Sequence, residues 1–269
     1  MAALGAGAIA LIRVALVTGA ARGIGAATVA RLDGDGWSIV AVDRAADDPR
    51  LPYAMGTAAE LDAVVAGARS AIAVAGDAAN LEVMTSAVAL AEEHFGGLDA
   101  VIAVAGVIAG GVPLWEVPIE QERAVIEVNL EGVLVAARAG VPALLRRPQP
   151  RAGRFVAVAS AAATRGLPML AAYCAAKAGV TGLVRGLAAE LRGTGVTANA
   201  VSPGSTATRI LDESARLYNL ESSEAFSAQQ PVDRLLEPDE VAAALVWLAG
   251  PDGAGVTGAT IPVDGGLAL

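Results

Sequence analysis

The stretch VALVTGAARGIG, residues 14–25, decides the fold of this chain. An apolar run of strand length leads directly into glycines at positions 19, 23 and 25. Glycines here allow the backbone to turn tightly and to approach a pyrophosphate, whose charge is met by the N–H groups of a following helix. The spacing Gly19-x3-Gly23-x-Gly25 differs from the usual dinucleotide fingerprint, so a turn required only for packing is the alternative.

The same pattern continues outward from this stretch, because short apolar runs alternate with longer segments of helical spacing. Strands buried on both faces of a parallel sheet are continuously apolar, and right-handed crossovers join them in βαβ units. We therefore predict an α/β fold in one domain over residues 1–269, a Rossmann-type doubly wound parallel sheet of about seven strands with helices on both faces. The expected strands are 14–18, 38–42, 71–75, 100–105, 155–159, 196–201 and 260–263.

Two segments interrupt this alternation. Residues 44–70 are longer than a typical strand-to-helix connection and are interpreted as an insert, a loop followed by a short helix over 58–70. Residues 205–236 match no strand and carry apolar side chains among polar ones. Because α/β proteins place binding loops and lids at the ends of strands, we expect a substrate lid in this second segment.

The composition excludes several classes of protein. The 269 residues are 55% hydrophobic and 17% charged, and the net charge is −9 without a basic stripe, so nucleic acid is not expected as a partner. One cysteine, Cys174, and one histidine, His94, offer no disulfide and no metal site, which favours a reducing, cytoplasmic setting.

Neither export nor membrane insertion is expected. The apolar first twelve residues have no preceding Lys or Arg, so they do not have the form of a signal peptide. No stretch reaches the roughly 18 uninterrupted apolar residues that a bilayer span requires.

Candidate nucleotide contacts follow the second and third strands. Asp43 lies 24 positions after Gly19, where a carboxylate accepts hydrogen bonds from the adenosine ribose and repels a 2′-phosphate. This favours NAD over NADP, although Arg22 and Arg44 are near enough in sequence to receive a phosphate. A solvated residue that caps the loop is the alternative for Asp43.

Asp77, after the third strand, is expected to meet the adenine amino group. Its alternative role is to cap the helix that begins near Asn80.

A candidate catalytic group lies in the second half of the chain. Tyr173 and Lys177 are four residues apart, so a helix presents them on one face, and Ser160 ends the preceding strand. An ammonium about 4 Å from a phenol favours the phenolate by up to ~4 kcal/mol, so Tyr173 is expected to exchange a proton near neutral pH. Ser160 would hydrogen-bond the same substrate oxygen. An ordinary surface pair is the alternative for the tyrosine and the lysine.

With these motifs the chain resembles the short-chain dehydrogenase/reductase family along nearly its whole length. The resemblance lies in Gly19-x3-Gly23-x-Gly25, Asn129, Ser160, Tyr173-x3-Lys177 and Pro203-Gly204, which appear in the family's order. It implies that Asn129 holds a water in a proton relay with Lys177, which also binds the nicotinamide ribose. It further implies that Pro203-Gly204 with Thr206 or Thr208 positions the nicotinamide carboxamide, and that the protein is a homotetramer. From the residues alone, Asn129 could instead bond its own helix, and the two threonines could cap a lid helix.

The chain departs from the family pattern after the fourth strand. Ala103-Val104-Ala105-Gly106 stands where the family usually has Asn-Asn-Ala-Gly, although Ala105 and Gly106 still permit close approach of the cofactor. Together with the insert, this sequence looks like the subgroup that is associated with the redox cofactor mycofactocin. That resemblance implies an NAD that stays bound beneath the insert and is reoxidised in place.

We therefore expect an oxidoreductase that transfers hydride between NAD and a small hydrophobic secondary alcohol or ketone. Its cofactor contacts would be Gly19, Arg22, Gly23, Ile24, Gly25, Asp43, Asp77, Ala105, Gly106, Tyr173, Lys177, Pro203, Gly204, Thr206 and Thr208. The alternatives are an NADPH-dependent 3-oxoacyl-(acyl-carrier-protein) reductase and, more remotely, a non-catalytic dinucleotide sensor.

Overall fold

A computed structural model describes residues 12–269 of the chain. Seven strands form one sheet in the order β3-β2-β1-β4-β5-β6-β7, and every pairing is parallel. The strands are β1 (Val14–Thr18), β2 (Ser38–Asp43), β3 (Ala71–Ala75), β4 (Ala100–Ala103), β5 (Arg154–Val158), β6 (Thr197–Pro203) and β7 (Thr260–Val263). This confirms the predicted α/β class and the Rossmann-type sheet.

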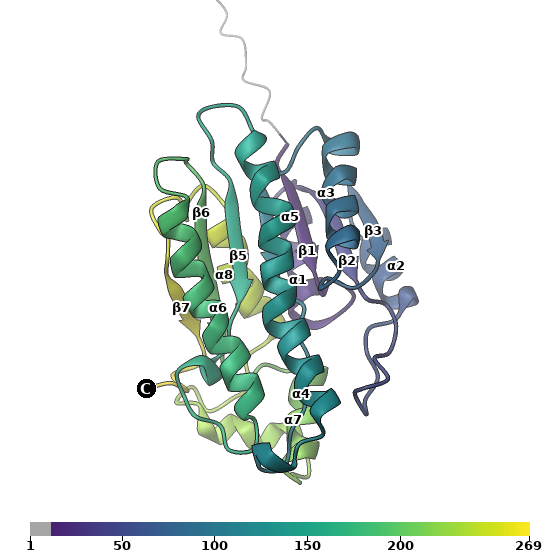
Figure 1. The fold of residues 1–269 in the computed structure, drawn as a ribbon, viewed down its shortest axis with the longest axis vertical. Coiled ribbons are helices and arrows are strands. Elements are labelled where there is room, and N and C mark those ends of the chain that lie inside the picture. The colour runs from purple at the N-terminus through teal and green to yellow at the C-terminus, as the bar shows by residue number, and fades with distance from the viewer. Residues whose placement is uncertain (1–11) are drawn as a thin grey trace, which may run out of the picture.

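Helices cover both faces of the sheet, as the three layers in Figure 1 show. On one face α3 (Leu81–Phe95), α5 (Gly132–Arg146) and α6 (Ala171–Glu190) pack in one apolar cluster with the sheet, and on the other α1 (Gly23–Gly34), α2 (Ala58–Ala66) and α8 (Pro238–Ala249) pack in a second. Small side chains fill both clusters, so the helices lie close to the strands. The two faces together bury the apolar runs that predicted the strands.

Two predicted boundaries are wrong. The strand expected over 100–105 ends at Ala103, because the hydroxyl of Thr18 accepts hydrogen bonds from the N–H groups of Val104 (3.1 Å) and Ala105 (3.2 Å). The Thr18 hydroxyl thereby joins β1 to the segment after β4. The helix expected over 58–70 ends at Ala66, where Gly67 begins a turn.

The remaining differences are shifts of one or two residues. The strand expected over 155–159 runs from Arg154 to Val158, the one over 196–201 from Thr197 to Pro203, and the one over 38–42 continues to Asp43. A strand continues as far as its neighbouring strand supplies hydrogen-bond partners. An apolar run in the sequence does not indicate where those partners end.

One helical stretch has the length and apolar composition of a membrane span. It covers residues 119–146, where α4 (Ile119–Ile126), the π-helical turn η2 (Glu127–Glu131) and α5 follow without a break. Within the described residues its α5 part packs against α3 and the sheet, where Val133, Ala136, Ala137, Ala143 and Leu144 are buried, whereas Leu134 and Ile119 are exposed. The expectation of no export signal concerns residues 1–12, of which 1–11 lie outside the described residues.

Candidate active site

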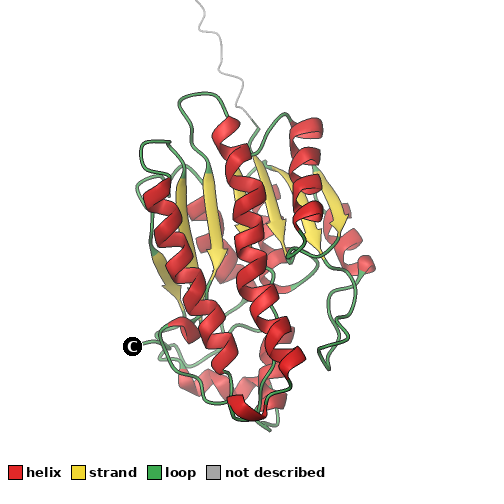
Figure 2. Ribbon diagram, in the orientation of Figure 1, coloured by secondary structure: helices red, strands yellow, loops and turns green. Residues whose placement is uncertain are grey.

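All strands point toward the same edge of the sheet, beyond which lie α7 (Arg209–Leu217) and the loop between β2 and α2 (Figure 2). A cavity of about 1180 Å³ opens there. Every residue that the sequence analysis proposed for catalysis or for cofactor binding lines this cavity. Parallel α/β sheets bind ligands beyond the carboxyl ends of their strands, so the location agrees with the predicted role.

The glycine-rich turn fits a pyrophosphate. Gly19 has a φ of +67°, and a Cβ there would lie 2.7 Å from the Cα of Ala105. A Cβ on Gly25 would overlap the carbonyl oxygen of Gly19. No side chain within residues 12–269 caps the start of α1, whose first turn also has no acidic residue. The N–H groups of this turn, which includes Ile24, are therefore available to an anion.

Asp43 is held at the edge of this turn. Its two carboxylate oxygens accept hydrogen bonds from the N–H groups of Ala21 and Ala45, both at 3.0 Å, and the residue is half-buried. Each oxygen keeps further lone pairs toward the cavity, where ribose hydroxyls would donate to them. The bond from Ala45 caps the loop after β2, as the alternative for Asp43 expects, although the residue is half-buried.

Both arginines that could have received a phosphate are already paired. Arg22 donates to the carbonyl oxygens of Ala54 (2.9 Å) and Met55 (3.0 Å). Arg44 donates to Asp48 (2.9 Å) and to Asp77 (3.1 Å). The possibility that they hold a 2′-phosphate therefore receives no support from the structure.

Asp77 accepts two hydrogen bonds within the protein. One carboxylate oxygen accepts from Arg44 and the other accepts from the N–H of Ala79 at 2.8 Å. The cap of α3 is Asn80, whose side chain accepts from the N–H groups of Glu82 and Val83. The helix-cap alternative for Asp77 is therefore wrong, although Asp77 does line the cavity.

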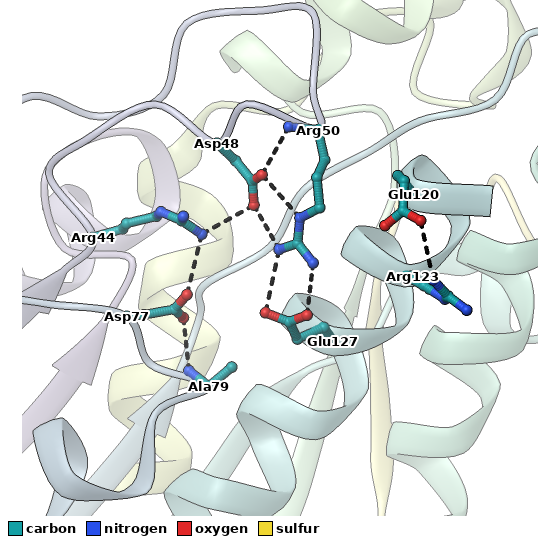
Figure 3. Close-up of polar contacts among 8 residues, drawn as sticks. All are labelled: Arg44, Asp48, Arg50, Asp77, Ala79, Glu120, Arg123 and Glu127. Carbon is teal, nitrogen blue, oxygen red and sulfur yellow. Dashed lines mark hydrogen bonds and ion pairs between the residues drawn. The ribbon is translucent and has the colours of Figure 1, made fainter. Parts of the chain in front are cut away.

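The loop over residues 44–57, which we call the strap, crosses the cofactor side of the cavity. Figure 3 shows how charges attach it to the rest of the fold. Arg50 donates to both oxygens of Asp48 and to both oxygens of Glu127, which begins η2. Arg44 links the strap to Asp77 after β3.

Asp48 is the centre of this network. Its side chain is only 2% exposed, and both Arg44 and Arg50 donate to it. The hydrogen bonds from Arg50 lower the pKa of the Asp48 carboxyl to about 2, against the opposing effect of burial. Asp48 is therefore ionised at neutral pH and joins the two arginines of the strap.

The catalytic group assembles as the spacing predicts. Tyr173 and Lys177 lie on α6, and Ser160 stands at the start of the 3-10 turn η3 (Ala161–Ala163), with its hydroxyl accepting from the N–H of Ala162. Ser160 acts to lower the pKa of Tyr173, which favours the phenolate. Lys177 is buried and donates to the carbonyl oxygen of Val158 at 2.9 Å.

The expectation that Lys177 lowers the pKa of Tyr173 is wrong for this structure. The lysine nitrogen lies 5.8 Å from the centre of the tyrosine ring and is directed to a backbone carbonyl. Burial raises the pKa of Tyr173 to about 12, with the Ser160 hydrogen bond acting in the opposite direction. Burial also lowers the pKa of Lys177 to about 8. Desolvation of both groups therefore outweighs their attraction.

Asn129 is fully buried within η2. Its amide nitrogen donates to the carbonyl oxygens of Val125 (2.9 Å) and Val107 (2.8 Å), so it bonds both its own helix and the segment after β4. A Cβ added to Gly106 would lie 3.0 Å from the Asn129 oxygen and 3.6 Å from the Lys177 nitrogen. Asn129 and Lys177 therefore face the same point of the cavity wall.

The segment after β6 closes the other side of the cavity. The Thr206 hydroxyl donates to the carbonyl oxygen of Gly204 at 3.1 Å, next to Pro203. Thr208 is the cap of α7, which confirms its alternative role, whereas Thr206 caps no helix. Both threonines line the cavity.

Tyr53 of the strap also lines the cavity, although no motif in the sequence indicated it. Its ring packs in an apolar cluster with Tyr173, Val107 and Ala109, and its hydroxyl accepts from the N–H of Ile108 at 2.9 Å. In the sequence, Tyr53 is only an aromatic residue within a polar loop. That pattern does not indicate which residues its side chain contacts.

Known proteins match this chain over almost all of its length. Residues 19–268 match a family model described as "Enoyl-(Acyl carrier protein) reductase". The chain belongs to the short-chain dehydrogenase/reductase (SDR) family. This SDR protein is 34% identical to (-)-trans-carveol dehydrogenase of Rhodococcus erythropolis, over 96% of this chain and 98% of that one. It is 36% identical to a 3-oxoacyl-[acyl-carrier-protein] reductase of Synechocystis, over 96% and 97% of the two chains.

A solved relative has the same fold. The crystal structure of carveol dehydrogenase from Mycobacterium avium in complex with NAD matches with a TM-score of 0.89 at 30% identity, over 95% of this chain and 97% of that one. The SDR protein described here is accordingly an NAD(P)-dependent oxidoreductase that acts on CH–OH groups.

Proposed function

We propose that this SDR enzyme oxidises a small hydrophobic secondary alcohol, or reduces the matching ketone, with NAD. The observation that carries the proposal is the convergence of Tyr173, Ser160, Lys177 and Asn129 on the cavity that begins at the glycine-rich turn. The carveol dehydrogenase relatives, named for a hydrophobic alcohol, support this substrate class.

The catalytic residues would have two roles, which are substrate binding and proton transfer. Ser160 would hold the substrate oxygen, and the Tyr173 oxygen would take the hydroxyl proton during oxidation and return it during reduction. Lys177 and Asn129 would pass that proton on toward solvent from the wall beside Gly106. Bound NAD would accept the hydride.

The electrostatics of the cavity favour NAD over NADP. Asp43 would repel a 2′-phosphate, and Arg22 and Arg44 are occupied by strap carbonyls and by carboxylates. The NADPH-dependent 3-oxoacyl reductase is therefore the less supported candidate. A complete catalytic group argues against a sensor without chemistry.

The strap supports a finer proposal, that NAD does not leave between turnovers. It is attached at three points, at Asp77, at Glu127 and, through its own carbonyls, at Arg22, so it would stay over the nucleotide. A covered NAD must be reoxidised in place by a second electron carrier, for which we propose mycofactocin. We further propose that the enzyme is cytoplasmic and homotetrameric.

The test is a comparison of turnover with and without an artificial electron acceptor. Purified enzyme is mixed with hydrophobic secondary alcohols and excess NAD, NADH absorbance is followed, and the nucleotide that denaturation releases is identified. We expect bound NAD, stoichiometric NADH, and turnover only with the acceptor. Continuous NADH production, or activity only with NADPH and a ketone, would contradict the finer proposal.

The catalytic assignment has its own control in Tyr173→Phe. This variant is expected to lose at least about a hundredfold in turnover and to keep its NAD, since it removes only the proton-transferring oxygen. A variant that retains most of its activity would refute the assignment.

A further inference from the structure

All three tyrosines of the chain, Tyr53, Tyr173 and Tyr218, line the cavity described above. Tyr173 has the catalytic role described above. Tyr218 of the segment after α7 donates its hydroxyl proton to the carbonyl oxygen of Pro168 at 2.7 Å, so that proton is used within the protein. Only Tyr53 has no catalytic role and no partner for its proton.

The hydroxyl of Tyr53 is held in place as an acceptor. The N–H of Ile108 donates to it at 2.9 Å, and Ile108 itself lines the cavity. A phenol that accepts one hydrogen bond still has its own proton to donate. Among the contacts of residues 12–269, no group accepts that proton.

The surroundings of Tyr53 keep the hydroxyl neutral and its position fixed. Burial raises the pKa of Tyr53 to about 12, so the proton is present throughout the physiological range. Tyr53 and Tyr173 both pack against the apolar cluster that contains Val107 and Ala109. The strap therefore contributes a hydrogen-bond donor to the same cavity that Tyr173 lines.

Apolar side chains of Leu167, Leu170, Ile210, Leu211 and Phe226 also line the cavity, and the hydroxyl of Ser214 donates to the carbonyl oxygen of Ile210. A donor whose proton has no partner within residues 12–269 distinguishes ligands by the presence or absence of an acceptor oxygen, because an unpaired buried polar group is costly.

We propose that Tyr53 is a specificity-determining residue that donates a hydrogen bond to a second oxygen of the substrate. The substrate class would be a hydrophobic secondary alcohol or ketone that carries another hydroxyl or carbonyl group. The inference rests on the proposed function, because it assumes that the alcohol carbon is placed at Tyr173. It also gives the strap a second role, since the segment over the nucleotide would complete the substrate site.

The test compares matched ligands on the NAD-loaded enzyme. The ligands share a trimethylcyclohexane ring and are the monoketone, the 1,4-dione and the 4-hydroxyketone. Dissociation constants are measured by NMR titration for the wild type and for Tyr53→Phe, together with the NAD content of each protein. We expect the wild type to bind the dione or the hydroxyketone about tenfold more tightly than the monoketone, and Tyr53→Phe to bind all three alike with its NAD retained.

A matched control is Tyr218→Phe, whose hydroxyl is occupied by Pro168. It is expected to change the binding of all three ligands by the same factor. Discrimination that persists in Tyr53→Phe, or that is absent from the wild type, would overturn the proposal. Loss of NAD together with equal weakening of every ligand would do the same, because it would place the Tyr53 hydroxyl on the nucleotide.

Turnover separates this inference from the proposed function. Each ketone is offered with a reduced dye and each corresponding alcohol with an electron acceptor. Tyr53-dependent binding without turnover of any compound would leave the Tyr53 assignment standing and would refute the dehydrogenase.

Discussion

Arg50 and Glu127 form a two-bond ion pair, with distances of 2.7 Å and 3.2 Å between the guanidinium nitrogens and the carboxylate oxygens (Figure 3). Arg50 belongs to the strap, whereas Glu127 stands two residues before Asn129 in η2. The pair therefore joins the strap directly to η2, which also contains Asn129, a residue that we propose takes part in proton transfer.

Glu127→Gln is expected to accelerate NAD release by about three- to tenfold. The substitution removes one charge from a half-exposed pair, which is worth roughly 1 kcal/mol. NAD release is measured by exchange of bound NAD against labelled NAD. Glu120→Gln is the matched control, because the Glu120–Arg123 pair lies in the same helix and is exposed on both sides. Equal exchange rates in the two variants would show that the pair does not hold the strap.

Asp48→Asn is expected to lower the free energy of unfolding by about 2 kcal/mol at pH 7. The folded pKa of about 2 lies below the ordinary value of 3.8, so this stabilisation is complete above the unfolded value and is lost as the pH falls through 2. Urea unfolding at pH 7 measures the difference, which should shrink between pH 4 and pH 2. Asp239→Asn, at an exposed pair, should show no measurable change.

The rate of alcohol oxidation is expected to rise with pH from 7 to 10. Oxidation needs the phenolate of Tyr173 as proton acceptor, and its pKa of about 12 leaves the phenol protonated at neutral pH. Ketone reduction uses the protonated form and should stay nearly constant over the same range. The measurement is the pH profile of turnover in both directions. An oxidation rate that levels off below pH 8 would mean that the tyrosine titrates lower than its burial implies.

Gly25→Ala is expected to abolish NAD binding, because its Cβ would overlap the carbonyl oxygen of Gly19. Gly34→Ala at the other end of α1 has nothing within 4 Å of the added Cβ, so it should bind NAD normally. It should also gain up to about 1 kcal/mol in stability, as alanine is the better helix former. NAD content after purification and thermal unfolding test both variants. Normal NAD content in Gly25→Ala would show that the turn relaxes around the added methyl group.

Local patterns were sufficient to predict most of the fold. The bounds of β1, β3 and β7 agree with the sequence, because each is an apolar run between turn residues. β4 is shorter than its apolar run because the Thr18 hydroxyl, 86 positions earlier, takes over the N–H of Val104. The hydrophobic periodicity of a sequence does not reveal a contact between residues so far apart. The same holds for the contact between Tyr53 and the backbone of Ile108.

The sequence by itself determined the strands of the sheet, the glycine turn and the pairing of Tyr173 with Lys177, since each depends on spacings within a short segment. Tyr173 and Lys177 share a face of α6 whatever surrounds them. Only the tertiary structure decided which charged side chains are paired within the protein and in which direction the pKa of Tyr173 is shifted. Arg22 donates to a backbone carbonyl of the strap, and Arg44 pairs with Asp48 within the strap. Burial raises the pKa of Tyr173. The physical reason is that pairing and desolvation depend on segments far apart in the chain, which only packing brings together.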